Sequence, residues 1–107
     1  MSNRFMRILV FFDLPVKTKS EKRDYGQFRK FLIGDGFGML QFSVYVRITR
    51  NHDDAQKHLK RLSLNLPLKG SVRVMLVTEK QYSSMAVMVG QKTSFERRLG
   101  EQELLFL

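Results

Sequence analysis

The sequence contains no cysteine, and none of its apolar runs is long. Without cysteine, the chain can form neither a disulfide framework nor a thiolate metal site. No stretch approaches the roughly 20 apolar residues that a membrane-spanning helix needs. The first residues also lack the small-residue cleavage site of a secretory signal peptide. We therefore expect a cytoplasmic protein without a membrane partner.

Acidic residues are scarce relative to basic ones. Ten Asp and Glu stand against 19 Lys and Arg, which gives a net charge of +9 in 107 residues. Residues 1–52 carry ten basic and four acidic groups, and residues 53–107 carry nine and six. This excess predicts a polyanionic partner such as nucleic acid. A solvated basic surface without a partner is the alternative, but the grouping of the charges favours nucleic acid.

The hydrophobic content of 43% and aromatic content of 11% argue against disorder. At this length the chain forms one domain. Its first predicted element is a strand over residues 4–13, whose two faces are both apolar, so we expect a central strand of a sheet. The strand ends at Asp13, and Pro15 closes it.

Two helices are expected on the basis of their start signals and apolar spacing. Thr18 and Glu21 have the spacing of a capping box, which predicts a helix to about Ile33 that stops at Gly34–Gly36. A second helix is expected over about Asp53 to Leu66 and ends before Pro67. The predicted buried stripes are Tyr25, Phe28, Phe31 and Leu32 in the first helix, and Ala55, Leu59, Leu62 and Leu66 in the second.

Further strands are expected at Phe37–Ile48, Ser71–Glu79 and Met85–Val89, with a fifth possible at Glu103–Leu107. Residues 37–48 form either one long strand or two paired pieces, and no tight turn signal separates the pieces. Residues 1–90 are therefore expected to form the domain, followed by a variable tail at residues 91–107. The tail is expected to add a strand at a dimer interface.

Both helices are expected on one face of the sheet, which leaves the apolar residues on the other face of the first strand uncovered. A large exposed apolar patch is unfavourable on a monomer. A second copy related by two-fold symmetry is the simplest cover, so we predict a homodimer.

Asp13 is the first candidate site residue. A two-fold axis that brings two copies of Asp13 together would let paired carboxylates hold a hard cation such as Mg²⁺. The alternative is that Asp13 only begins a turn. Ser43 is a candidate to support this site or contact phosphate, although most such serines only satisfy a neighbouring strand. His52 with Asp53 and Asp54 is better explained by helix capping than by metal binding, and His58 is expected on the surface.

The basic residues of the two helices are the candidate nucleic-acid contacts. In the first helix these residues are spaced seven apart, nearly two turns, so we expect them on one flank. Such side chains follow a phosphate backbone without reading its bases. Solvated helix faces are the alternative. The predicted contacts are Lys22, Arg23, Arg29, Lys30, Lys57, Lys60 and Arg61.

Taken together and in this order, ILVFFDLP, the basic first helix, QFSVY (Gln41 to Tyr45) and VTEKQ (Val77 to Gln81) resemble a known family. It is the small CRISPR-associated adaptation protein family, the non-integrase partner in spacer acquisition. The similarity covers about Met6 to Val89. The stretch MAVMVG after VTEKQ is similar to the version that accompanies type II systems.

The resemblance implies an α+β, ferredoxin-like homodimer in which residues 37–48 form two strands or one bent strand. It also implies metal-dependent endonuclease activity on RNA or duplex DNA, with Asp13 as the catalytic and metal-binding residue and Mg²⁺ or another divalent cation as cofactor. Members are further described as the bridge between CRISPR-associated integrase dimers that hold a DNA fragment. The two descriptions differ on whether the aspartate is needed.

Three functions follow as hypotheses. The first is a dimeric scaffold for duplex DNA in CRISPR adaptation, with phosphodiester hydrolysis at Asp13. The second is a non-catalytic interaction module. The third is a toxin-like ribonuclease of the same fold that acts on messenger RNA.

Overall fold

The computed structural model describes residues 5–90. Its elements alternate as strand, helix, strand, strand, helix and strand, with a short helix at the end. The predicted tail at residues 91–107, with its possible strand at Glu103–Leu107, lies outside the described residues. The elements are β1 (Met6–Asp13), α1 (Lys19–Gly34), β2 (Gly38–Gln41), β3 (Val44–Thr49), α2 (His52–Ser63), β4 (Ser71–Thr78) and α3 (Glu79–Ser83).

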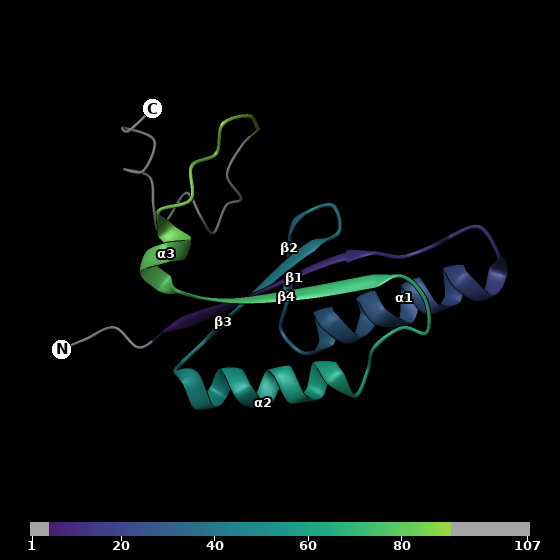
Figure 1. Cartoon of the computed structure of the whole chain (residues 1–107), viewed down its shortest axis with the longest axis horizontal. Helices are drawn as coiled ribbons and strands as arrows, with labels where there is room; N and C mark the ends of the chain where they lie inside the picture. The colour runs from purple at the N-terminus through teal and green to yellow at the C-terminus, as the bar shows by residue number, and fades with distance from the viewer. Residues whose placement is uncertain (1–4, 91–107) are drawn as a thin grey trace.

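The four strands form one antiparallel sheet in the order β2-β3-β1-β4. This order, with its two helical crossovers, is the ferredoxin-like arrangement, so the predicted fold class is confirmed. β1 is central, as expected from its two apolar faces. Figure 1 shows α1 and α2 together along one face of the sheet, while α3 follows the end of β4.

The segment predicted as Phe37–Ile48 is a hairpin of two strands, β2 and β3. Its turn consists of Phe42 and Ser43, and Ser43 has a φ of 65°. Positive φ in a two-residue turn is usually supplied by Gly or Asn. A serine in that conformation explains why the sequence shows no turn signal here.

The helix starts follow from local hydrogen bonds. The Thr18 hydroxyl accepts from Glu21 N–H at 3.0 Å, and the Glu21 carboxylate accepts from Thr18 N–H at 3.1 Å, which confirms the predicted capping box. The second helix is shorter than predicted. It ends at Ser63, and Leu66 is 51% exposed rather than part of the buried stripe.

The strand predicted at Met85–Val89 is wrong, because residues 85–90 contain no strand. The strand predicted to end at Glu79 stops at Thr78, and α3 follows. Thr78 and Gln81 form a second capping box: Thr78 N–H donates to Gln81 Oε1 at 2.9 Å, and Gln81 N–H donates to the Thr78 hydroxyl at 3.0 Å. This box starts α3 directly after β4, so Glu79 belongs to the helix rather than to the strand.

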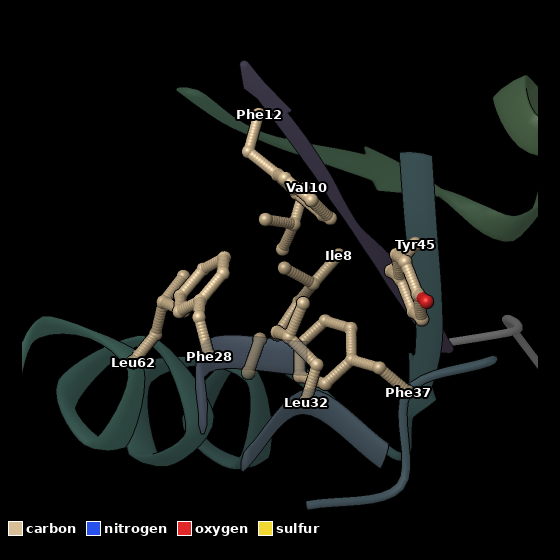
Figure 2. Packing of buried hydrophobic residues seen from close by; sticks show 9 residues of the cluster. Ile8, Val10, Phe12, Phe28, Leu32, Phe37, Tyr45 and Leu62 are labelled. Atoms are coloured by element: carbon tan, nitrogen blue, oxygen red, sulfur yellow. The ribbon is translucent and has the colours of Figure 1, made fainter. Parts of the chain in front are cut away.

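The main core lies between the sheet and the two long helices. Ile8, Val10 and Phe12 extend from β1 toward α1 and α2 (Figure 2). Phe12 meets Phe28 edge-on with ring centroids 5.3 Å apart, an arrangement that favours aromatic pairs. The other buried members are Leu32, Phe37, Tyr45, Ala55 and Leu62.

The opposite face of the sheet carries a second apolar set. Because side chains alternate along a strand, Leu9 and Phe11 share a face with their register partners, which are Val46 and Val44 on β3 and Met75 and the exposed Arg73 on β4. Met75 is 52% exposed. α3 packs on β1 and β4 at the far end of this face, where the Tyr82 ring lies 4.4 Å from the Arg7 guanidinium. We call this side the open face.

Within residues 5–90, no helix combines the length and the apolar composition that crossing a bilayer requires.

Candidate active site

Asp13 is the last residue of β1, and its side chain is exposed. Its register partner on β4 is Ser71, the last pair of the β1–β4 ladder. Alternation along β1 places Asp13 on the open face, beyond Phe11 and Leu9. The carboxylate therefore lies at the edge of the apolar surface for which a second copy is predicted.

Ser43 lies at the same end of the sheet. Its carbonyl oxygen accepts a hydrogen bond from Phe12 N–H at 3.1 Å, directly before Asp13 in the chain. The structure thus brings Asp13, Ser43 and Ser71 to one sheet end, although they come from three different segments. Ser71 was not among the residues predicted from the sequence, because only the pairing of β1 with β4 places it there.

One chain supplies few ligands for a metal ion at this end. Among residues 5–90, no three His, Cys, Asp or Glu side chains are grouped to hold a metal. The exposed Asp13 carboxylate suits a hard cation, which prefers oxygen ligands, but one carboxylate is insufficient. The donor set fits a divalent cation only if two chains each contribute Asp13.

The seven predicted nucleic-acid contacts are all exposed on α1 and α2. Three of them have intramolecular partners: Arg29 Nε donates to the Tyr45 hydroxyl at 2.8 Å, Lys57 lies 3.2 Å from Asp54, and Arg61 lies 2.9 Å from Asp35. Lys22, Arg23, Lys30 and Lys60 form no ion pair with the part of the chain that the structure describes. Contact of all seven with nucleic acid stays a prediction.

The expectation that His58 is a surface residue is wrong. His58 is 3% exposed, and its Nδ1 lies 2.8 Å from Asp35 Oδ2. Arg61 binds the other oxygen of the same carboxylate at 2.9 Å. Asp35, which follows α1, therefore ties the end of α1 to α2.

The N-cap of α2 is Asn51 rather than Asp53 or Asp54, which both lie in the first turn, and Asp54 supports the cap. Its carboxylate accepts from Arg50 N–H at 3.0 Å, and its own N–H donates to the Asn51 side chain at 2.8 Å. His52 is exposed in the same turn, and its Nε2 lies 3.4 Å from Gln56 Nε2.

We expect this helix junction to weaken in acid. The hydrogen bond from Arg50 N–H, together with Lys57, lowers the pKa of Asp54 to about 2. Burial by itself would raise the pKa of Asp35, but bonds from His58 and Arg61 outweigh it and hold that pKa below its ordinary value. A depressed pKa stabilises the fold above the unfolded pKa, and this stabilisation disappears as pH falls through the folded pKa.

The free energy of unfolding in urea should therefore fall as the pH drops from about 4 to about 2. Asp54→Asn should cost about 1–3 kcal/mol at neutral pH, because it removes charged hydrogen bonds, and should flatten the decline in acid. Asp53→Asn, on the exposed side of the same turn, is the matched control. An equal acid decline in wild type and Asp54→Asn would contradict this prediction.

Comparison with known proteins decides the family. The family model "CRISPR associated protein Cas2" matches residues 6–85, which include β1 with Asp13 and the whole sheet. The chain belongs to the Cas2 family. The resemblance inferred from its motifs is thereby confirmed.

Two curated Cas2 relatives match over nearly their whole length. A "CRISPR-associated endoribonuclease Cas2" from Acidovorax ebreus (strain TPSY) is 52% identical over 99 residues, which are 92% of this chain and 97% of that protein. A protein of the same name from Ligilactobacillus salivarius (strain UCC118) is 43% identical over 100 residues, 94% of this chain and 99% of that protein. Their name supports nuclease activity at the level of the family.

A crystal structure of Cas2 superposes on this chain with a TM-score of 0.50 and 18% sequence identity. The match covers 84% of this chain and 92% of that one. At this identity the similarity supports the fold alone, and it agrees with the ferredoxin-like order of the sheet.

Proposed function

We propose that this Cas2 protein works as a homodimer that joins through the open face, cleaves phosphodiester bonds of RNA at paired Asp13 residues, and holds duplex DNA for the CRISPR-associated integrase during spacer acquisition. The observation that carries the proposal is that Asp13 shares a face with an apolar surface. Val44, Val46 and Met75 lie beside Leu9 and Phe11 on that face. Two-fold packing there covers the apolar side chains and brings the two carboxylates toward each other.

Two Asp13 carboxylates from facing strand ends supply the negative oxygen ligands that Mg²⁺ prefers. A bound divalent cation would stabilise charge on the phosphate and make an attacking water more acidic. Asp13 would hold the cation, and Ser71, its register partner on the same face, would offer its hydroxyl to a phosphate oxygen. Both residues are exposed, so a phosphodiester can reach them.

The basic helices support the second half of the proposal. α1 and α2 lie on the sheet face opposite the open face, so a dimer presents both pairs of helices outward. Lys22, Arg23, Lys30 and Lys60 are exposed there and carry charge that no described acid neutralises. Contacts of this kind hold a duplex by its phosphates and therefore weaken with salt.

The salt dependence of duplex binding provides a quantitative test. Each lost phosphate contact should lower the magnitude of the slope of log K against log salt by about 0.9, so Lys30→Ala should lower it by about 2 in a dimer. Lys80→Ala, an exposed lysine on α3, serves as the control and should leave the slope unchanged. A duplex affinity that does not depend on salt would contradict backbone binding.

The cleavage half is tested with purified protein and single-stranded RNA over a series of divalent cations. We expect cleavage with Mg²⁺ or Mn²⁺ and none in excess chelator. Absence of cleavage across metals and pH would reject the nuclease assignment.

A scaffold without catalysis is the second candidate, and it is favoured because residues 5–90 contain no group of three side chains that could hold a metal ion. Spacer acquisition by a strain carrying Asp13→Asn separates the two roles. If spacer acquisition persists while RNA cleavage is lost, the scaffold role does not need the Asp13 carboxylate and the cleavage does.

A further inference from the structure

Gly70 lies where β4 begins, directly before the register partner of Asp13. Its φ is +95°, a conformation that residues with a side chain rarely adopt. A Cβ placed on Gly70 would lie 2.6 Å from the carbonyl oxygen of Asp13 and 2.8 Å from Leu14 Cδ2. Both distances are shorter than real contacts of a Cβ atom. Only a hydrogen atom therefore fits between Gly70 and the end of β1.

The obstruction is mainly backbone and cannot rotate away. The same Cβ would lie 3.1 Å from Leu14 Cα, in addition to the Asp13 oxygen. On the other side of β1, Phe12 N–H is bonded to the Ser43 carbonyl. The end of β1 is therefore enclosed from β4 and from the β2–β3 turn, and a side chain at Gly70 can be accommodated only if the strand end moves.

We propose that Gly70 is a positioning residue for Asp13: its missing side chain sets where the β1 end, and with it the carboxylate, stands. The inference deepens the proposed function and rests on Asp13 being the catalytic group. Gly70 itself supplies no group to the reaction. Its effect passes through the backbone of Asp13. Because Ser71 follows Gly70 and pairs with Asp13, the position of Ser71 depends on Gly70 as well.

Gly70→Asn is the discriminating variant. Asparagine tolerates positive φ better than other side chains, so it relieves the conformational cost, but it still carries the obstructing Cβ. Misplacing a reacting group by about 1 Å can cost about 100-fold in rate, and we expect a loss of this order in kcat with KM for RNA unchanged. The matched control is Gly90→Asn, because Gly90 has a φ of +107° and none of the described residues beyond its chain neighbours comes within 4 Å of its Cβ position.

A double-variant cycle tests whether Gly70 acts through Asp13. In an Asp13→Asn background, Gly70→Asn should cause no further loss of cleavage, since coupled residues are not additive. In the metal-free protein, the NMR signals of the Asp13 carboxyl carbon and the Phe12 amide should shift in Gly70→Asn and stay in place in Gly90→Asn.

Full cleavage by Gly70→Asn, additive losses in the cycle, or unmoved Asp13 signals would each overturn the inference. So would a Gly70→Asn chain that fails to fold where Gly90→Asn folds, since the role would then be structural only. If wild type cleaves no RNA, the proposed function fails. In that case the metal-free NMR shifts still decide whether Gly70 sets the Asp13 position.

Discussion

Replacing Asp13 by Asn should lower metal-dependent RNA cleavage by roughly 100- to 1000-fold, the loss typical when a group that stabilises transition-state charge is removed. The amide keeps the size of the side chain but removes the negative oxygen ligand. Asp13 is exposed at the end of β1, and no ion pair to the described residues depends on its charge. The thermal midpoint and the dimer mass should therefore stay close to wild type.

Asp53→Asn is the charge-matched control, because Asp53 is exposed in the first turn of α2 and outside the candidate site. It should cleave RNA as wild type does. Equal cleavage rates for Asp13→Asn and wild type, measured with the same preparation of metal and RNA, would remove Asp13 from the chemistry.

Replacing Arg7 by Met should destabilise the fold by about 3–5 kcal/mol, the usual loss when one partner of a buried ion pair is removed. The Arg7 side chain is 3% exposed and binds Glu79 through two bonds, Nε to Oε1 at 2.6 Å and an Nη nitrogen to Oε2 at 3.0 Å. Its guanidinium also lies over the Tyr82 ring. Arg7 thus fastens α3 to the centre of the sheet, and its loss leaves the Glu79 carboxylate largely buried without this partner.

Removing both partners should cost less than the sum of the single losses, because apolar replacements of a whole buried pair are often nearly neutral. Urea unfolding of Arg7→Met, Glu79→Met and the double variant gives the interaction energy. Lys69→Met is the comparison, since the exposed Lys69–Glu21 pair at 3.7 Å should contribute about 0–1 kcal/mol. Strictly additive losses would show that the two side chains do not stabilise each other.

The parts of the fold that follow local rules could be predicted from the sequence. The Thr18–Glu21 box, the glycines that end α1 and the two apolar faces of β1 each depend on residues close in the chain. His58 could also have been placed correctly. It stands three residues after Ala55 and four before Leu62, both buried, so helical geometry puts all three on one face. Its polarity led to the opposite expectation.

The turn at Ser43 and the burial of Arg7 have physical causes that the local sequence pattern does not show. Ser43 adopts a positive φ that its residue type rarely takes. The Thr78–Gln81 box, by contrast, has the capping-box spacing, so the start of α3 could have been placed from the sequence. Arg7 lies within an apolar run, and its burial depends on partners far away in the chain, among them Glu79, 72 residues away, and Tyr82.

The candidate site also combines a residue that its local sequence predicts with residues that only the folded chain brings together. Asp13 was found because a charge ends an apolar strand. The closeness of Ser71 and Gly70 to Asp13 cannot be predicted in the same way, because it depends on the long-range pairing of β1 with β4.

We propose that two copies of the chain meet through the open face and bring their Asp13 residues together. Since the chain has no cysteine, Asp13→Cys provides one labelling site per subunit, and Lys60→Cys on α2 is the control on the opposite side of the sheet. We expect a dimeric mass in solution and, by pulsed electron spin resonance, a much shorter distance between nitroxide labels at position 13 than at position 60. A monomeric mass, or labels at position 13 that lie farther apart than those at position 60, would contradict the account.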